Sequence, residues 1–290
     1  MIRLDAATVL LQWATGGLLF LWVTTRRREV GIGYGWLLRA VYGVLAVGAA
    51  AAGLVVDPVP VRDVASLGVA AAATAALAVS IVRRKAGVAG ERARQERKAS
   101  RVAAMAAKVG TAGDPAAAPA PAPEFPPALD LAAPLIGLVG LVAAGIAAGG
   151  PDALAVARTL AGALFLGAVS DAMLLGHWYL VQPGLGRGPL LELNRWLALT
   201  WPLEVGLLLW PTGMLSVLSG SVDDGWGGTL GWFWVACAVT TLVLTAVTKA
   251  ALKERAYSAV MAATGLLYLA TSPPSAPTWW PGRCWPNCGG

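Results

Sequence analysis

Long apolar stretches separated by short polar breaks recur along the whole of this 290-residue sequence. A helix needs about 20 apolar residues to cross the hydrocarbon core of a bilayer. We count eight such stretches, at residues 6–25, 32–56, 64–82, 131–149, 153–182, 197–218, 228–250 and 255–271. Their apolar runs are unbroken and show no period of two, which argues against a membrane β-barrel. The sequence therefore predicts an all-α integral membrane protein with about eight transmembrane helices.

The overall composition agrees with lipid as the main solvent. Hydrophobic residues make up 57% of the chain and charged residues only 13%, with a mean hydropathy of +0.65. That leaves too few polar side chains to cover the surface of a soluble domain. The first apolar stretch is expected to be a retained helix and not a secretory signal, because the basic cluster at 26–28 follows it and no small-residue cleavage site ends it.

The distribution of basic residues predicts the orientation of the chain. If the N-terminus lies outside, eight alternating spans place four connecting segments in the cytoplasm, at 26–31, 83–130, 183–196 and 251–254. Of the 22 Lys and Arg residues, 18 then lie at the inner side, and only four lie outside, namely Arg3, Arg62, Arg158 and Arg283. This bias follows the positive-inside rule. We expect a bacterial-type inner (plasma) membrane protein with both termini extracytoplasmic.

The cytoplasmic segment 83–130 divides the chain into a three-helix membrane part, 1–82, and a five-helix part, 131–271, followed by a tail, 272–290. Residues 83–109 carry nine basic side chains against two glutamates, so their net charge of +7 exceeds the +6 of the whole chain. Their composition favours a helix that extends from the third span. Residues 110–130 alternate Ala and Pro, as in an extended polyproline II tether.

The basic residues of 83–108 suit a dock for anionic lipid headgroups or for an acidic partner protein. The alternative is a solvated signal that only sets the orientation. Nucleic acid is not an expected partner, because no aromatic side chains interleave the charges and no nucleic-acid-binding motif accompanies them.

Asp171, His177 and Glu204 fall well inside the adjacent fifth and sixth stretches. Each costs roughly 2.5–3.5 kcal/mol in hydrocarbon, so such residues tend to face protein or a wet cavity and to serve a function. Counted from Pro183, His177 lies about 9 Å and Asp171 about 18 Å from the inner boundary, and Glu204 lies about 10 Å deep on the next helix. His177 and Glu204 are thus expected at matching depth, and Ser170 shares the helix face of His177.

This cluster can hold or pass protons, because histidine titrates near neutral pH and carboxylates in an apolar site bind protons more tightly than in water. It can also serve a quinone headgroup, with Trp178, Tyr179 and Trp201 as aromatic walls. We therefore expect the integral subunit of a larger, redox-linked complex. The alternatives are a secondary transporter with an ion or substrate site at these residues, and a purely structural scaffold subunit.

Several kinds of chemistry are not expected. A chain with one histidine cannot ligate a haem through two histidines, and no metal-binding or nucleotide-binding motif occurs in a fitting context. In the tail, Cys284 and Cys288 are candidates for a small disulfide in an oxidising compartment. Two thiolates without further ligands nearby do not make a metal site.

Overall fold

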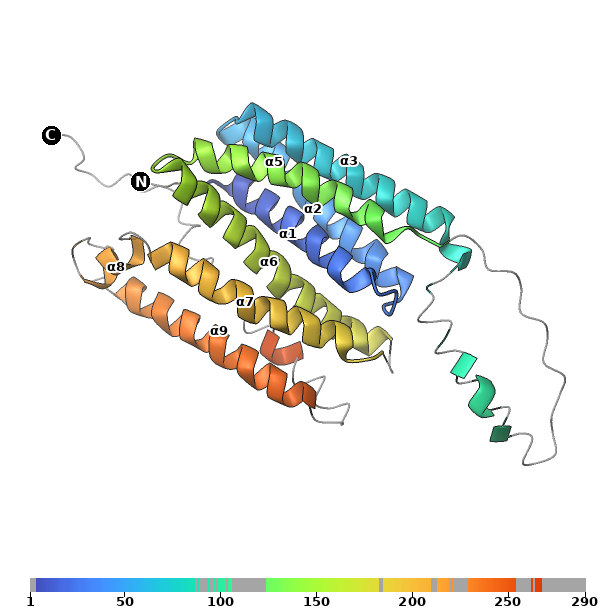
Figure 1. The fold of residues 1–290 in the computed structure, drawn as a ribbon. Coiled ribbons are helices and arrows are strands. Elements are labelled where there is room, and N and C mark those ends of the chain that lie inside the picture. The colour runs from blue at the N-terminus through green and yellow to red at the C-terminus, as the bar shows by residue number, and fades with distance from the viewer. Residues whose placement is uncertain are drawn as a thin grey trace.

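The structure, a computed structural model, describes residues 4–86, 88, 93, 96, 97, 99–102, 104, 105, 124–182, 185–209, 213–219, 221, 229–253, 262 and 264–267. Every regular element in this part of the chain is a helix (Figure 1). The α-helices are α1 (Ala6–Thr25), α2 (Ile32–Val56), α3 (Pro60–Val82), α5 (Ala132–Ala147), α6 (Asp152–Val181), α7 (Gly188–Leu209), α8 (Gly213–Leu218) and α9 (Thr229–Lys253). Two short 3-10 helices are η1 (Arg84–Ala86) and η2 (Pro127–Leu131).

Six of these helical segments are long and apolar enough to cross a membrane. They are Ala6–Thr25, Ile32–Val56, Pro60–Val82, Pro127–Ala147, Asp152–Val181 and Gly231–Lys253. The chain therefore has the character of a multi-pass α-helical membrane protein. Of the other two expected spans, 255–271 lies mostly outside the described residues, and α7 carries Glu192, Arg195 and Glu204, which lower its hydropathy. The total of eight stays a prediction.

Helix α1 lies at the centre of the bundle (Figure 1) and is the most enclosed of the six segments, with 72% of its apolar window buried. It packs against α2, α5 and α6, while α3 packs on α2 and α5. Helix α7 covers α6, and α9 covers α7. Helices from before and after the segment 83–130 therefore pack directly against one another.

Glycines allow α1 and α6 to approach closely. A Cβ atom at Gly16 would lie 1.8 Å from the carbonyl oxygen of Ala163, and one at Gly167 would lie 2.2 Å from the carbonyl carbon of Gly16. No side chain fits at either position, so the two backbones are in contact.

The charged residues gather at the two ends of the bundle. One end, called the basic end below, holds Arg26, Arg27, Arg28, Arg83 and Arg187. Arg26 and Arg27 pair there with Glu192 near the start of α7, and Arg187 donates to the carbonyl oxygen of Leu252 near the end of α9, at 3.1 Å. The opposite end, called the far end, holds Asp5, Arg62, Asp63, Asp152 and Arg158. Arg62 is buried there between Asp5 and Asp63.

Two boundaries differ from the expected spans for a clear reason. Helix α3 begins at Pro60 and not at 64, because Pro60 occupies the first turn and the carboxylate of Asp63 accepts from the backbone N–H of Val59, at 3.0 Å. Helix α7 begins at Gly188 and not at 197, because Glu192 is paired with arginines of the α1–α2 turn. Charges that look like loop residues in the sequence are thus part of the helices.

The segment 83–130 also differs from expectation. Helix α3 ends at Val82, and the tighter turn of η1 follows it, so the basic segment is not a direct extension of α3. Its described residues between 93 and 105 are helical, and both Val102 and Met105 are exposed. Residues 110–123 of the expected tether lie outside the described residues, but its last part, 124–130, packs against the basic end.

Candidate functional site

Asp171 lies in the protein core, with none of its surface exposed. It is on α6, about 15 Å from the last residue of that helix and about 28 Å from the first. The hydroxyl of Tyr42 on α2 donates to Asp171 Oδ1 and lies 3.1 Å from the hydroxyl oxygen of Ser170. The hydroxyl of Tyr34 donates to the backbone carbonyl of Asp171, at 3.3 Å. Two tyrosines from α2 therefore converge on one carboxyl group of α6.

The Tyr42 ring occupies the space beside Gly17, which has no side chain. A Cβ atom at Gly17 would lie 2.1 Å from Cζ of Tyr42, so the ring lies flat against the α1 backbone. This contact directs the Tyr42 hydroxyl past α1 toward α6. The three helices α1, α2 and α6 therefore fix the hydrogen bond to Asp171 together.

The second carboxyl oxygen of Asp171 is unusual. Asp171 Oδ2 is buried and has no hydrogen-bond partner among the described residues, and it is the one carboxyl oxygen of that part of the chain in this condition. A buried acceptor without a partner costs about 1–3 kcal/mol, and more when it is charged. A carboxyl group that only tied helices together would be expected to have both oxygens bonded.

The other sequence-predicted residues on α6 lie nearer the basic end. His177 is exposed on the surface of the helix. Trp178 donates to the side-chain oxygen of Gln182, at 3.0 Å, and its ring packs 6.0 Å from the ring of Tyr34. Tyr179 is buried and donates to the carbonyl oxygen of Gly186 in the α6–α7 connection. These contacts close the basic end of the α2–α6 interface.

Glu204 lies near the far end, next to Arg158 of α6. Only 9% of its surface is exposed. Arg158 donates to the carbonyl oxygen of Leu207, one turn further along α7, at 2.8 Å. Trp201 points the other way, since its indole N–H donates to the carbonyl oxygen of Ala238 at 3.0 Å and ties α7 to α9.

His177 and Glu204 are therefore not at matching depth. Glu204 is level with Arg158, which is 19 residues from His177 on the same helix, a separation of about 28 Å. The expectation of equal depth is wrong because α7 begins nine residues earlier than 197, which moves Glu204 toward the far end. One quinone headgroup cannot contact both side chains. Ser170, which was expected to act with His177, instead contacts Tyr42 together with Asp171.

The structure also contains a buried ion pair, between Arg39 and Asp130, that was not predicted from the sequence. Arg39 of α2 donates twice to Asp130 of η2, from Nε and Nη2, with both distances 2.7 Å. The guanidinium also lies 4.4 Å from the ring centre of Phe125. Arg39 lies within the second apolar stretch. The cost of a charged side chain in hydrocarbon, which drew attention to Asp171, therefore applies to Arg39 as well. Asp130, in contrast, was assigned to the tether.

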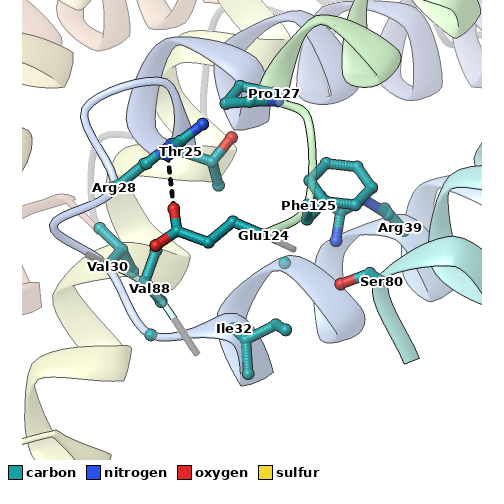
Figure 2. A pocket seen from close by; sticks show the side chains of 12 residues that line it. Thr25, Arg28, Val30, Ile32, Arg39, Ser80, Val88, Glu124, Phe125 and Pro127 are labelled. Atoms are coloured by element: carbon teal, nitrogen blue, oxygen red, sulfur yellow. Dashed lines mark hydrogen bonds and ion pairs between the residues drawn. The ribbon is translucent and has the colours of Figure 1, made fainter. Parts of the chain in front are cut away.

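This pair borders a pocket at the basic end, shown in Figure 2. Glu124 reaches from the extended segment before η2 to Arg28 in the α1–α2 turn, and Phe125 lies over Arg39. The side chain of Arg83 donates to the carbonyl oxygen of Glu124, at 2.9 Å. The residues after the tether are thus held in place by three arginines.

The described part of the chain contains no group of three or more metal-ligating side chains. Cys237 is a half-buried free thiol on α9, while Cys284 and Cys288 lie outside the described residues, so their disulfide stays a prediction. Comparison with protein-family models, curated proteins and solved structures finds no match to this chain. The candidate site accordingly rests on its geometry, which centres on Asp171, Tyr42 and Ser170.

Proposed function

We propose that this chain is a membrane protein that passes protons through Asp171. The observation that carries the proposal is the carboxyl group enclosed in the bundle, with one oxygen bonded to Tyr42 and the other without a partner in the described part of the chain. Ionisable groups at such depth are expensive, and where they occur they often belong to proton relays. The carboxyl group thus has two points of proton exchange, one at the oxygen bonded to Tyr42 and one at the free oxygen.

A proton fits this site better than a larger substrate does. Carriers for larger substrates use broken helices around a central cavity. Helix α6 runs unbroken through Asp171 over its full 30 residues, and Asp171 lines neither the pocket at the basic end nor the one beside Glu204. A proton needs only a chain of hydrogen-bonding groups, which the hydroxyls of Tyr42 and Ser170 supply.

The orientation and the assembly belong to the same proposal. The basic end faces the cytoplasm, in keeping with the positive-inside rule. The chain works as the integral subunit of a larger complex whose reaction delivers or uses the proton. Native purification with other subunits, and loss of their proton-linked turnover in Asp171→Asn, would support this role over that of a stand-alone carrier.

Proton flux into vesicles tests the central claim. The purified full-length chain is reconstituted into liposomes that contain a pH-sensitive dye, and a potassium diffusion potential drives protons across the membrane. We expect wild-type vesicles to exceed protein-free vesicles, and Asp171→Asn to reduce the protein-dependent flux by about a hundredfold, because a positioned proton-transfer group contributes that much or more. Tyr42→Phe, which keeps the ring and removes the hydroxyl, should also lower it.

Asp152→Asn is the matched control, since Asp152 is exposed at the start of the same helix and should leave the flux unchanged. Equal unfolding temperatures of the variants and the wild type establish that the fold is retained. The proposal is overturned if wild-type vesicles conduct no better than protein-free ones, or if folded Asp171→Asn and Tyr42→Phe both conduct like wild type. The latter result would favour a structural scaffold.

A further inference from the structure

We infer that Glu204 takes up protons at the far end and passes them to Asp171 through Ser170 and Tyr42. This inference rests on the proposed function and adds to it a route and a side of entry.

Glu204 lines a pocket between α1, α6 and α7. The other residues that line it are Leu4, Val9, Gln12, Arg158, Gly162, Phe165, Leu166 and Leu208. The space inside it holds about one water molecule, and a water in such a site needs two to four polar partners. The carboxylate of Glu204, the amide of Gln12 and the guanidinium of Arg158 are polar groups that can bind such a water.

Glu204 itself has the features of a proton acceptor. It is more than nine-tenths buried, and within the described residues its carboxylate makes no hydrogen bond and no ion pair at contact distance. The amide nitrogen of Gln12 is instead bonded to the carbonyl oxygen of Thr159, at 2.8 Å, and Arg158 is bonded to the carbonyl oxygen of Leu207. The carboxylate is therefore left to the pocket.

The pocket reaches to within one helical turn of the Asp171 site. Leu166 lines the pocket, and its carbonyl oxygen accepts from the hydroxyl of Ser170 at 2.6 Å. The Ser170 hydroxyl oxygen lies 3.1 Å from that of Tyr42, whose hydroxyl donates to Asp171. Each hydroxyl from Ser170 to the buried carboxyl group therefore lies within hydrogen-bond distance of the next, and one helical turn separates Ser170 from the pocket residue Leu166.

The proton balance of this route is simple. Glu204 releases its proton to water in the pocket, and in this proposal a water that bridges the one helical turn between Leu166 and Ser170 gives a proton to the Ser170 oxygen. The Ser170 hydroxyl passes its own hydrogen to the Tyr42 oxygen, and Tyr42 passes its hydrogen to Asp171. Each hydroxyl ends with one hydrogen, Glu204 becomes a carboxylate and Asp171 becomes neutral. Ser170 has one hydrogen and three acceptors within reach, Leu166 O, Gly167 O and the Tyr42 oxygen, so its rotation resets the chain.

The charges around Glu204 are few. Arg158 faces it from α6. On α1, the pocket residues Leu4, Val9 and Gln12 carry no charge, and on α7 the nearest pocket residue is Leu208. The described charges of α9, Lys249 and Lys253, lie at its basic end. The dependence of flux on pH at the far end is thus expected to follow Glu204.

Two measurements on the reconstituted protein test this route. Flux is recorded while the pH is varied separately on each side of vesicles whose protein orientation is scored by chemical labelling. We expect Glu204→Gln to lower the flux by about a hundredfold and to abolish its dependence on pH at the far-end side only, as for loss of a proton-transfer group. Glu204→Asp keeps a carboxylate at this position and should therefore retain part of the flux and of its dependence on far-end pH. In a cysteine-free background, Leu208→Cys should react with a membrane-impermeant maleimide from the far-end side.

Glu192→Gln is the control, because it changes the same residue type on the same helix at the basic end and should keep the far-end pH dependence. The inference fails, while the proposed function stands, if Asp171→Asn abolishes flux but Glu204→Gln conducts with an unchanged far-end pH profile. It also fails if Leu208→Cys reacts only from the basic side. Absence of flux in the wild type would instead defeat the proposed function.

Discussion

At the scale of single residues, Arg39 and Asp130 form the ion pair of the described bundle in which both partners are most deeply buried. Both side chains are almost fully buried, at 3% and 1% exposure, and they meet through two hydrogen bonds. A buried ion pair contributes little compared with an apolar pair of the same shape, but the loss of one partner leaves a bare charge and costs about 3–5 kcal/mol. The pair therefore stabilises the basic end only while it is complete.

A double-mutant cycle tests this reading. We expect Asp130→Asn to lower the unfolding temperature of the detergent-solubilised protein strongly, because Arg39 then stays buried without its counter-charge. The double variant Arg39→Met with Asp130→Leu should regain most of the loss, since it removes both charges. Tryptophan fluorescence during thermal unfolding gives the measurement. A double variant as unstable as Asp130→Asn alone would show that the charges themselves are needed.

At the scale of elements, the contact between α1 and α6 depends on the absence of side chains. We expect Gly167→Ala to push the two helices apart, because its Cβ would lie 2.2 Å from the Gly16 carbonyl carbon. The variant should unfold at a clearly lower temperature. Gly206→Ala is the control, since nothing lies within 4 Å of its Cβ position and alanine favours a helix over glycine by about 1 kcal/mol. Equal effects of the two changes would contradict the close contact.

The elements themselves were largely predictable from the sequence, whereas their ends were less so. The first two helices match the predicted stretches 6–25 and 32–56 because apolar residues fill them without interruption. The prediction missed the starts of α3 and α7, where Asp63 and Glu192 carry charge. A hydropathy pattern interprets a charged residue as part of a loop. It contains no information on the partner of that charge, such as Arg26, which pairs with Glu192 from 166 residues away.

At the scale of the whole molecule, the gathering of basic side chains at one end predicts its orientation. In a background without Cys237, Cys284 and Cys288, we expect Ala153→Cys at the far end to react with an impermeant maleimide on intact cells. Ser100→Cys in the basic segment should react only after the membrane is opened. Both positions are exposed in the structure. The reverse labelling pattern would invert the proposed sidedness.

The candidate site shows what a sequence leaves open at this scale. Asp171 was singled out by the cost of a carboxylate in lipid, but its partner Tyr42 is 129 residues away and looks like any interfacial aromatic residue. Which side chains meet depends on how α1, α2 and α6 pack, and the 28 Å between His177 and Glu204 follows from a shift in the start of one helix. Local composition identifies costly residues, and packing decides their neighbours.

The hydrogen bond from Arg83 to the backbone of Glu124 joins the two ends of a 40-residue excursion. The chain therefore leaves and re-enters the bundle at neighbouring points. Evolution can lengthen, replace or delete such a segment without rebuilding the core, as insertions succeed where chain ends are close. A few glycines and serines in place of residues 88–122 should therefore leave a bundle that still assembles.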